Sequence, residues 1–413
     1  MIKTLLTITT IVLCCTVFSQ ESVTITGKIV DVETNEALSF ATINIKNSPK
    51  GVVANEEGEF EFTFSSEYLK DTIVFSYAGY QTEEALAQAI YTRETTIQLV
   101  KKSVMLAEVV VTNKELTAWQ IIELALLNIK ENYPTKPFEL KAFYRDYKIE
   151  NEKCVSIFEA AISAYDKGYS KVLAEYAFKE KVVLEQVRKS LAVDYQTHAF
   201  KRINIIKEIL RLNDVRYQSR ALRKKNHERY SYDLAGYEVI NNRLMYKIKA
   251  VEDWSYFIYV DVVSYAIPKI EMQFNWEKDV AENSWSLFDS IRYNQTKATM
   301  QMDFQMIDGR YYPRYCSFTT NLDAFDYTTN EPLFSSYLKQ EYMVTDIDFN
   351  PDEKPKKQVR MNPEEMIENQ TANYDAEFWE NYNVLKLHPR DAELIKGLEE
   401  KMKIEEQFAK DNQ

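Results

Sequence analysis

The feature that most constrains this chain is the alternation of apolar and polar side chains within residues 51–80. Phe60, Phe62 and Phe64 are separated by single polar residues, so an extended backbone points all three rings to one side. A glycine shortly before this run can take the positive φ that a tight reversal needs. The same period of two returns at residues 73–77. This stretch therefore predicts paired, half-buried strands.

The flanking segments carry the same pattern. Short alternating runs at residues 23–30, 40–45 and 95–100 lie before and after the central strands, with turn-forming residues between them. Six or seven short strands without a long helix are typical of a β-sandwich. We therefore predict a small sandwich domain at the start of the chain.

Five sequence blocks in this region carry a family resemblance: GKIVD at 27–31, ALSFATI at 37–43, EGEF at 57–60, FSYAGY at 75–80 and LAEVVV at 106–111. With them, residues 22–112 resemble the carboxypeptidase-regulatory-like domain, a transthyretin-like β-sandwich. In Gram-negative cell envelopes this domain often precedes the plug of TonB-dependent transporters. No plug pattern and no long barrel follow here. The resemblance therefore implies an envelope protein without that receptor barrel, and neither transport nor peptidase activity.

Residues 1–19 have the features of a secretory signal peptide. Lys3 precedes an uncharged apolar core, and small residues stand three and one positions before Gln20. The apolar run is short for a spanning anchor, and neither Cys14 nor Cys15 follows the small residue that lipid attachment requires. No later stretch reaches the roughly 20 apolar residues of a spanning helix. We expect an exported protein, periplasmic or associated with the outer membrane, without a transmembrane segment in the mature chain.

Charge and cysteine content exclude two further classes. The chain carries 51 basic and 63 acidic side chains, a formal net charge of −12. This excess of negative charge disfavours nucleic acid as a partner. Only Cys154 and Cys316 lie outside the signal peptide, which excludes a disulfide-rich scaffold. They form either one disulfide, which an oxidising compartment permits, or two buried thiols, and the sequence leaves both open.

The rest of the chain predicts an α+β second domain in a mainly β protein. Residues 113–134 carry a helical apolar stripe and are expected to form a connector helix. Residues 138–349 contain alternating strands joined by tight turns, which predicts a curved antiparallel sheet with covering helices. Residues 350–372 are rich in proline and charge, as in a linker, and residues 373–413 are expected to form a helical tail.

Three short stretches within this sheet carry a second resemblance: YVD at 259–261, IPKI at 267–270 and YYP at 311–313. Their order along the strands is similar to that in the half-barrel of lipoprotein-carrier proteins (LolA/LolB-like). This resemblance implies a concave sheet that handles lipids or lipoproteins.

One strand of this domain carries a candidate ligand-binding face. Met300, Met302, Phe304 and Met306 alternate with polar residues, so all four point to one side. Adaptable methionine side chains can line a cavity for acyl chains. The alternative is that this face is packed into the core. A large dry cavity beside the strand would favour lipid binding.

A basic segment stands out in this acidic chain. Residues 188–229 contain twelve Lys or Arg against four Asp or Glu. Its amphipathic character identifies five residues that could face a partner or make peripheral contact with an anionic membrane: Lys201, Arg202, Arg223, Lys224 and Lys225. The alternative is a solvated helix and loop lying over the sheet.

Groups for catalysis, cofactor binding or metal binding are missing from the sequence. His198, His227 and His388 lack the spacing of a zinc site, and there is no Gly-x-Ser-x-Gly elbow or phosphate loop. Glu159 and Asp261 would form an acid–base pair if they converged, but ion pairing of each is the simpler interpretation. We therefore predict no enzyme, no cofactor and no metal.

Together these features predict an exported, non-enzymatic cell-envelope protein that binds a partner protein or an apolar ligand. A lipid- or lipoprotein-handling protein is the first alternative. A glycan-acting enzyme is the second, and carboxylates clustered roughly 5 to 10 Å apart in an open cleft would favour it. If the core is filled on both faces of the sheet, partner binding remains as the favoured function.

Overall fold

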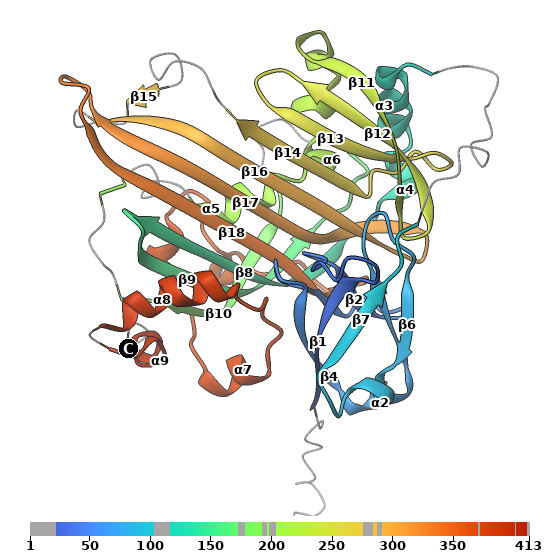
Figure 1. Ribbon diagram of the computed structural model, residues 1–413, viewed down its shortest axis with the longest axis horizontal. Helices are drawn as coiled ribbons and strands as arrows, with labels where there is room; N and C mark the ends of the chain where they lie inside the picture. Colours follow the sequence, from blue (N-terminus) through green and yellow to red (C-terminus); the bar gives the residue numbers. More distant parts are fainter. Residues whose placement is uncertain are drawn as a thin grey trace, which may run out of the picture.

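The computed structural model is mainly β, with a small sandwich followed by a large antiparallel sheet and covering helices (Figure 1). This confirms the predicted fold class. The predicted signal peptide, Lys201 and Arg202 lie outside the residues that the structure describes. Those residues are 22–102, 116–171, 178–191, 196–197, 204–275, 284–286, 291–370, 372–400 and 402–410. Among them, no helix has the length and apolar character needed to cross a membrane.

The N-terminal part consists of two small sheets packed together. One sheet has the strand order β4-β1-β7 and the other the order β3-β2-β5-β6. Phe60, Phe62 and Phe64 lie in the core that the sheets share, as the alternation predicted. The elements are β1 (Ser22–Asp31), β2 (Thr42–Ile45), β3 (Gly51–Val53), β4 (Glu59–Ser65), η1 (Ser66–Lys70), β5 (Thr72–Ser76), β6 (Glu83–Leu86), α2 (Ala87–Ile90) and β7 (Thr95–Leu99).

The second part is built on one eleven-stranded antiparallel sheet. Its strand order is β10-β9-β8-β18-β17-β16-β14-β13-β12-β11, and β15 pairs separately with β16. The strands are β8 (Phe138–Glu150), β9 (Lys153–Asp166), β10 (Lys181–Lys189), β11 (Ser231–Ile240), β12 (Arg243–Val251), β13 (Ser255–Asp261), β14 (Lys269–Asn275), β15 (Ser284–Ser286), β16 (Ile291–Ile307), β17 (Arg310–Asp326) and β18 (Pro332–Asp348). Because β8 pairs with β18, the first and last strands of this part are neighbours inside the sheet, with two strands on one side of them and six on the other.

Helices cover one face of this sheet, which we call the inner face. In Figure 1 α5 and α6 lie behind the sheet, and α3 and α4 lie at its upper right. Residues of these helices share one apolar core with strand residues such as Ile248, Met302 and Tyr342. Met361 and Ile367, from the segment after β18, join the same core. The covering elements are α3 (Ala118–Leu127), α4 (Ile129–Asn132), α5 (Ile205–Leu210), α6 (Asp214–Tyr217), η4 (Arg220–Leu222), η5 (Lys224–Arg229), η6 (Lys357–Val359) and η7 (Ile367–Asn369).

Two helices stand where the sequence predicted one connector helix over residues 113–134. α3 begins with a capping box: Thr117 Oγ1 accepts from the Gln120 amide at 3.2 Å, and Gln120 Oε1 accepts from the Thr117 amide at 2.8 Å. It ends before Asn128, whose backbone leaves the helical region and whose Nδ2 donates to the Leu124 carbonyl. Residues 113–115 lie outside the described residues.

The opposite, outer face carries the sandwich and the C-terminal tail. Phe143, Tyr315 and Met343 of the sheet share a core with the sandwich, and Trp379 of the tail joins it. The tail contains α7 (Ala376–Asn381), α8 (Pro389–Lys396), η8 (Gly397–Glu400) and α9 (Ile404–Lys410). The sheet is therefore covered on both sides, by helices on one and by a second domain and the tail on the other.

A β-bulge in β17 attaches the sandwich to the sheet. Arg314 is the extra residue, because its two neighbours pair with consecutive residues of β16. Its buried guanidinium donates to the carbonyl oxygens of Ile43 (3.1 Å) and Val52 (2.9 Å) in the sandwich and of Val344 (2.9 Å) in β18. Burial lowers the pKa of Arg314 to about 9. Gly51 leaves room for it, since a Cβ there would lie 2.3 Å from Arg314 Nη2.

Candidate functional site

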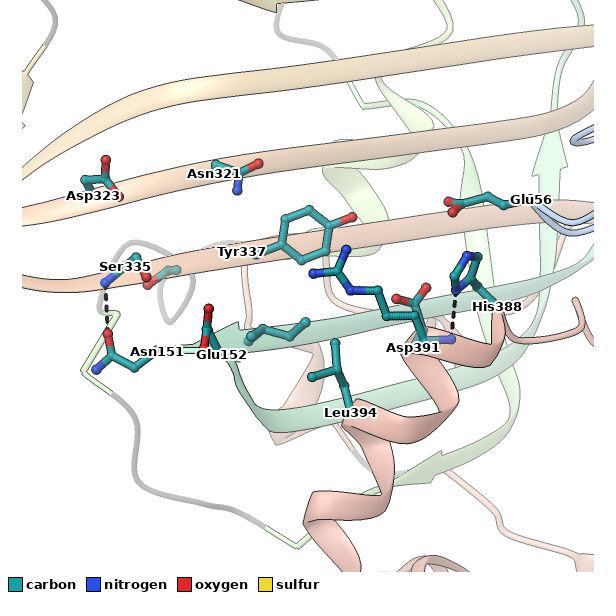
Figure 2. A pocket seen from close by; sticks show the side chains of 13 residues that line it. Glu56, Asn151, Glu152, Asn321, Asp323, Ser335, Tyr337, His388, Asp391 and Leu394 are labelled. Atoms are coloured by element: carbon teal, nitrogen blue, oxygen red, sulfur yellow. Dashed lines mark hydrogen bonds between the residues drawn. The ribbon is translucent and has the colours of Figure 1, made fainter.

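A polar trench of about 680 Å³ lies on the outer face of the sheet (Figure 2). Four segments far apart in the sequence enclose it: the β3–β4 turn of the sandwich, the β8–β9 hairpin, strands β17 and β18, and the first turns of α8. Its lining residues are Glu56, Ile149, Asn151, Glu152, Asn321, Asp323, Ser335, Ser336, Tyr337, His388, Arg390, Asp391 and Leu394.

A tight hairpin turn forms one end of the trench. Asn151 and Glu152 both take positive φ values, 48° and 64°, which reverse the chain between β8 and β9. The Asn151 amide donates to the Ser335 carbonyl at 3.0 Å, and Asn151 Oδ1 accepts from the Ser335 amide at 3.1 Å. These two bonds hold the hairpin against β18, so Glu152 and Asp323 lie at the same end in Figure 2.

The start of α8 forms the other end. His388 caps the helix, because its Nδ1 accepts from the Arg390 amide at 2.9 Å, and Pro389 occupies the first helical position. His388 Nε2 also contacts Glu57 of the sandwich turn. This double contact fixes the first turn of α8, and with it Arg390 and Asp391, beside the sandwich.

Lys339 joins three carboxylates beneath the trench. Its Nζ lies 2.7 Å from Glu56, 3.3 Å from Asp391 and 3.5 Å from Glu341. Burial alone would lower the pKa of Lys339, but these three carboxylates outweigh burial and raise it. Tyr147 donates its hydroxyl to Asp391. One ammonium group therefore ties together the sandwich, the sheet and the tail.

The charge network continues away from the trench under the tail. Arg145 lies 3.7 Å from Glu341 and 2.6 Å from Glu159, and Arg188 lies 2.5 Å from Glu159. Burial would raise the pKa of Glu159, but Arg188 and Arg145 outweigh it and lower the pKa. Arg188 also stacks over the Trp379 ring at 4.3 Å. Alternating charges thus run through this part of the outer face, beside the apolar core that the sheet shares with the sandwich.

Glu159 and Asp261 do not form the acid–base pair that the sequence left open. Asp261 pairs with Arg243 at 2.5 Å and accepts from the backbone amides of Val263 and Ser264 at the end of β13. Five strands separate β13 from β9 in the sheet. Each carboxylate is therefore an ion-pair partner, as the simpler interpretation expected.

Three charged groups in the trench are free for a ligand. Among the described residues, no hydrogen bond or ion pair engages the side chains of Glu152, Asp323 or Arg390. Partial burial raises the pKa of Asp323. Tyr337 contributes a half-buried ring beside them, and Asn321 an amide. The trench can therefore bind cationic groups at the hairpin end and an anionic group at Arg390.

The structure places the four residues of the predicted methionine face in two different environments. Met300, Met302 and Phe304 are at most 4% exposed and belong to the inner core. The cavity beside Met302 measures only about 30 Å³. Met306 is 45% exposed, because it stands next to the turn that ends β16, where fewer side chains enclose it. The four residues therefore do not line one cavity in the described structure.

From residue 204 onward the basic segment lies on the inner face, whereas Arg188 lies on the outer face. Ile205, Ile206, Ile209 and Leu210 of α5 are buried against the sheet. Four of the segment's cations pair with acids from other segments, in the pairs Arg188–Glu159, Lys207–Glu364, Arg216–Asp166 and Arg229–Glu252. Arg211 and Arg220 pair with acids of the segment itself, Glu208 and Asp214. Part of the local excess of positive charge is thus compensated.

The remaining candidates from this segment lie near its end. The Lys224 side chain is 82% exposed and lies 3.6 Å from Glu123, so any attraction between them is weak. Lys225 is exposed, and Arg223 is half-buried. They do not approach the trench, which none of them lines.

The two cysteines within the described residues, Cys154 and Cys316, are free thiols. Cys154 packs with Phe408 on the outer face, whereas Cys316 belongs to the inner core. The disulfide that the sequence left open is therefore not formed, because the two side chains lie on opposite faces of the sheet. Burial raises the pKa of Cys154 to about 12, which is the behaviour of an unreactive thiol.

The histidines also lie apart. His227 stacks on Trp119 at 4.9 Å, and His388 lines the trench. His198 is outside the described residues. Among the residues that are described, no group of three or more His, Cys, Asp or Glu side chains could hold a metal ion.

Sequence reasoning missed most of the trench. Glu56, Glu152, Asp323 and Arg390 are ordinary exposed residues when each is considered in its own segment. The available indications were local ones, an Asn-Glu pair between two strands and a His-Pro pair before an amphipathic helix. They mark a turn and a helix start, but do not show that the two would meet.

Comparisons with known proteins support the first domain. Residues 25–111 match the family model of the CarboxypepD_reg-like domain. This confirms the resemblance proposed from the five sequence blocks. No protein of curated function matches the chain.

Solved structures give more distant likenesses. A LolA superfamily protein from Nitrosomonas europaea is 12% identical, with 60% of this chain and 99% of that one covered and a TM-score of 0.22. A DUF1329 family protein from Desulfovibrio piger is 10% identical, with 58% and 95% covered and a TM-score of 0.26. At these TM-scores the likenesses establish no shared fold, and we base no conclusion on them.

Proposed function

We propose that this chain is an exported, non-enzymatic binding protein of the cell envelope, and that its polar trench docks an extended polar segment of a partner protein. The observation that carries the proposal is the convergence of three unpaired charged groups in a pre-formed trench. Glu152 and Asp323 stand at one end and Arg390 comes from the helix at the other.

The trench has the dimensions and rigidity of a binding site. Its volume of about 680 Å³ falls within the range of roughly 300 to 1,000 Å³ usual for ligand sites. Lys339 and the capped start of α8 hold its walls in place, so little ordering would be needed on binding. Carboxylates facing a guanidinium favour a partner with complementary charges of both signs, and a polypeptide segment can carry both.

Lipid or lipoprotein handling has less support. An acyl chain needs an apolar cavity, and the space beside Met302 equals about one liquid-water volume. The inner face around it is filled by helices in the described structure. The trench is lined mainly by polar side chains and offers an acyl chain no continuous apolar wall.

A glycan-acting enzyme also has less support. The trench does contain several carboxylates, as that alternative requires. However, Lys339 contacts both Glu56 and Asp391, so both carboxylates are already engaged in ion pairs. A catalytic carboxyl must instead be within hydrogen-bond reach of the substrate. We therefore assign these two residues to holding the trench walls.

Site-specific photo-crosslinking in the native envelope tests the proposal. A photoreactive residue replaces Asn321 in the trench, and in a control it replaces the exposed Glu61 on the sandwich. We expect a discrete protein adduct at position 321 that is absent at position 61 and lost when Arg390→Glu is added. An adduct that survives Arg390→Glu, or lipid found by native mass spectrometry without any protein adduct, would overturn the proposal.

A further inference from the structure

A second groove, which we call the neutral groove, lies between the sandwich and the large sheet. Its volume is about 210 Å³. The β2 and β5 strands of the sandwich form one wall, and the end of β16 with the β11–β12 turn forms the other. The side chains that matter below are Thr42, Asn44, Ser76, Asn241, Gln305 and Met306.

The composition of the neutral groove sets it apart from the trench. Only one of its thirteen lining residues, Asp308, carries a charge, although 28% of the chain is charged. Amides and hydroxyls make up most of the rest. These groups hydrogen-bond in both directions without net charge, so they suit an uncharged ligand that is rich in donors and acceptors.

The geometry of the sandwich wall favours recognition by side chains. Along β2 the core residues Ile43 and Ile45 alternate with Thr42 and Asn44, which therefore stand on the face toward the groove. β2 is paired on both sides, with β3 and with β5. It offers no free backbone edge, so a peptide could not bind here by extending the sheet.

Besides the uncharged polar lining, a buried amide without a hydrogen-bond partner supports a ligand in this groove. Gln305 is 8% exposed and lines the groove, yet its Nε2 has no hydrogen-bond partner among the described residues. A buried donor without a partner is costly, and native proteins rarely keep one unless something else completes it. A hydroxyl-bearing ligand, reached by rotation of the amide, would provide that partner.

The groove also offers apolar contacts, from the half-buried Val74 and from Met306. Met306 is 45% exposed and lies among the polar lining residues. Its flexible thioether side chain can adapt to an irregular apolar surface. The volume of about 210 Å³ corresponds to roughly seven liquid-water molecules, so it holds one small molecule or one ring of a larger one.

We infer that the neutral groove binds a neutral saccharide unit, with its hydroxyls on Asn44, Asn241 and Gln305 and an apolar ring face on Met306. A sugar ring combines many uncharged hydroxyls with a patch of C–H groups, which matches the lining. This site is independent of the trench, since the two share no lining residue.

Ligand-observed NMR on the full chain provides the test. Saturation transfer is measured separately to glucose, galactose, mannose and N-acetylglucosamine at millimolar concentration. Two variants remove one amide each: Asn44→Ala, and Asn241→Gly, which keeps the positive φ of 49° at that turn. We expect transfer to at least one sugar and an affinity about five- to tenfold weaker in each variant, as loss of one hydrogen bond implies. Thermal unfolding confirms that both variants fold.

Two controls make the result decisive. Asp323→Asn, in the trench, should leave sugar binding unchanged, so failure of the trench proposal and failure of this one are distinguishable. Glycerol, a small polyol without a ring, should show no comparable transfer. Absence of transfer to all four sugars, equal transfer to glycerol, or binding that neither variant weakens would each overturn the inference.

Discussion

Both faces of the large sheet combine apolar packing with buried charges, but they arrange the charges differently. On the outer face the charges form one continuous chain from Arg188 to Lys339, whereas on the inner face they form separate pairs such as Arg216–Asp166. On the inner face apolar side chains such as Met302 and Tyr342 fill the space beneath the helices. On the outer face Arg145, Glu159 and Glu341 are just as inaccessible to solvent, at 2 to 3% exposure, and they are charged. Apolar packing is non-directional, whereas a buried charge needs its counter-charge in one place.

This difference separates structural and binding roles. Apolar packing can be rearranged with moderate loss and leaves little empty space, as the cavity of about 30 Å³ indicates. A continuous chain of ion pairs fixes the positions of neighbouring polar groups. The trench and the neutral groove both lie beside elements docked on the outer face. Four measurements test or sharpen this contrast.

The largest effect is expected from breaking the outer charge network. Glu159→Ala leaves Arg145 and Arg188 without the carboxylate that they share. We expect the free energy of unfolding to fall by about 3 to 5 kcal/mol, the usual loss when a buried ion pair is broken. Urea unfolding at neutral pH measures it. The exposed Glu61→Ala is the control, and a loss at Glu159 as small as the control's would show that charges do not hold this face.

The inner face should respond as a packed core. Met302→Ala removes a side chain that is 3% exposed, and we expect a loss of about 2 to 4 kcal/mol. The matched control is Met306→Ala on the same strand, which should cost under about 1 kcal/mol because that side chain is 45% exposed. Equal losses at the two positions would instead indicate that Met302 lines an open cavity. Chemical denaturation of both variants distinguishes these outcomes.

The inner face contains one carboxyl whose titration should be visible. Burial, with a contribution from the Asp166 charge, raises the pKa of Glu180 from 4.5 to about 7. The folded state therefore holds this proton more tightly than the unfolded chain. Its stabilisation is complete below pH 4.5 and is lost as the pH rises to 7. Between pH 5 and pH 7.5 the free energy of unfolding of the wild type should therefore fall by roughly 2 kcal/mol more than that of Glu180→Gln.

Unfolding curves of wild type and Glu180→Gln at pH 5 and pH 7.5 provide the measurement. The Tyr217 hydroxyl donates to Glu180, and a glutamine carbonyl can accept the same bond. The variant should therefore match wild type at pH 5 and exceed it at pH 7.5. A variant that is less stable than wild type at both values would mean that Glu180 is stabilising in its ionised form.

The smallest effect on stability is expected in the trench. Asp323→Asn removes a charge that has no partner among the described residues, so the free energy of unfolding should change by less than about 0.5 kcal/mol. The photo-crosslink from position 321 should nevertheless weaken. Glu331→Gln, an exposed acid outside the trench, is the control and should leave the adduct unchanged. An adduct insensitive to Asp323→Asn would place the partner elsewhere.

Local sequence patterns predicted local structure well. The alternation around Phe62 gave a strand of the sandwich, and Asp308-Gly309 forms one of the tight turns expected between strands of the large sheet, with positive φ at both residues. The pairing of β8 with β18, which sets Tyr144 opposite Tyr342, was not predictable. Many strands of similar pattern compete for each neighbour, and the period of two does not encode which pair forms.

Predictions about individual sites were less successful for the same reason. The same sequence pattern in the Met300 strand fits a face that lines a ligand cavity and a face that packs in the core. Only the positions of α5 and α6 decide between these two. In the described part of residues 188–229, acids from other segments such as Asp166 and Glu252 neutralise some of the basic side chains. Single residues show their type in the sequence but not their partners.

The sequence by itself determined the period of the strands, the family of the first domain and the shortage of groups for bond-making chemistry, because these depend on neighbours along the chain. The tertiary structure alone decided which charges were paired, which apolar strand faces were covered, and that Arg390 and Asp323 line the same trench. Those outcomes depend on contacts between segments far apart in the sequence, whose burial and counter-charges exist only after the chain has folded.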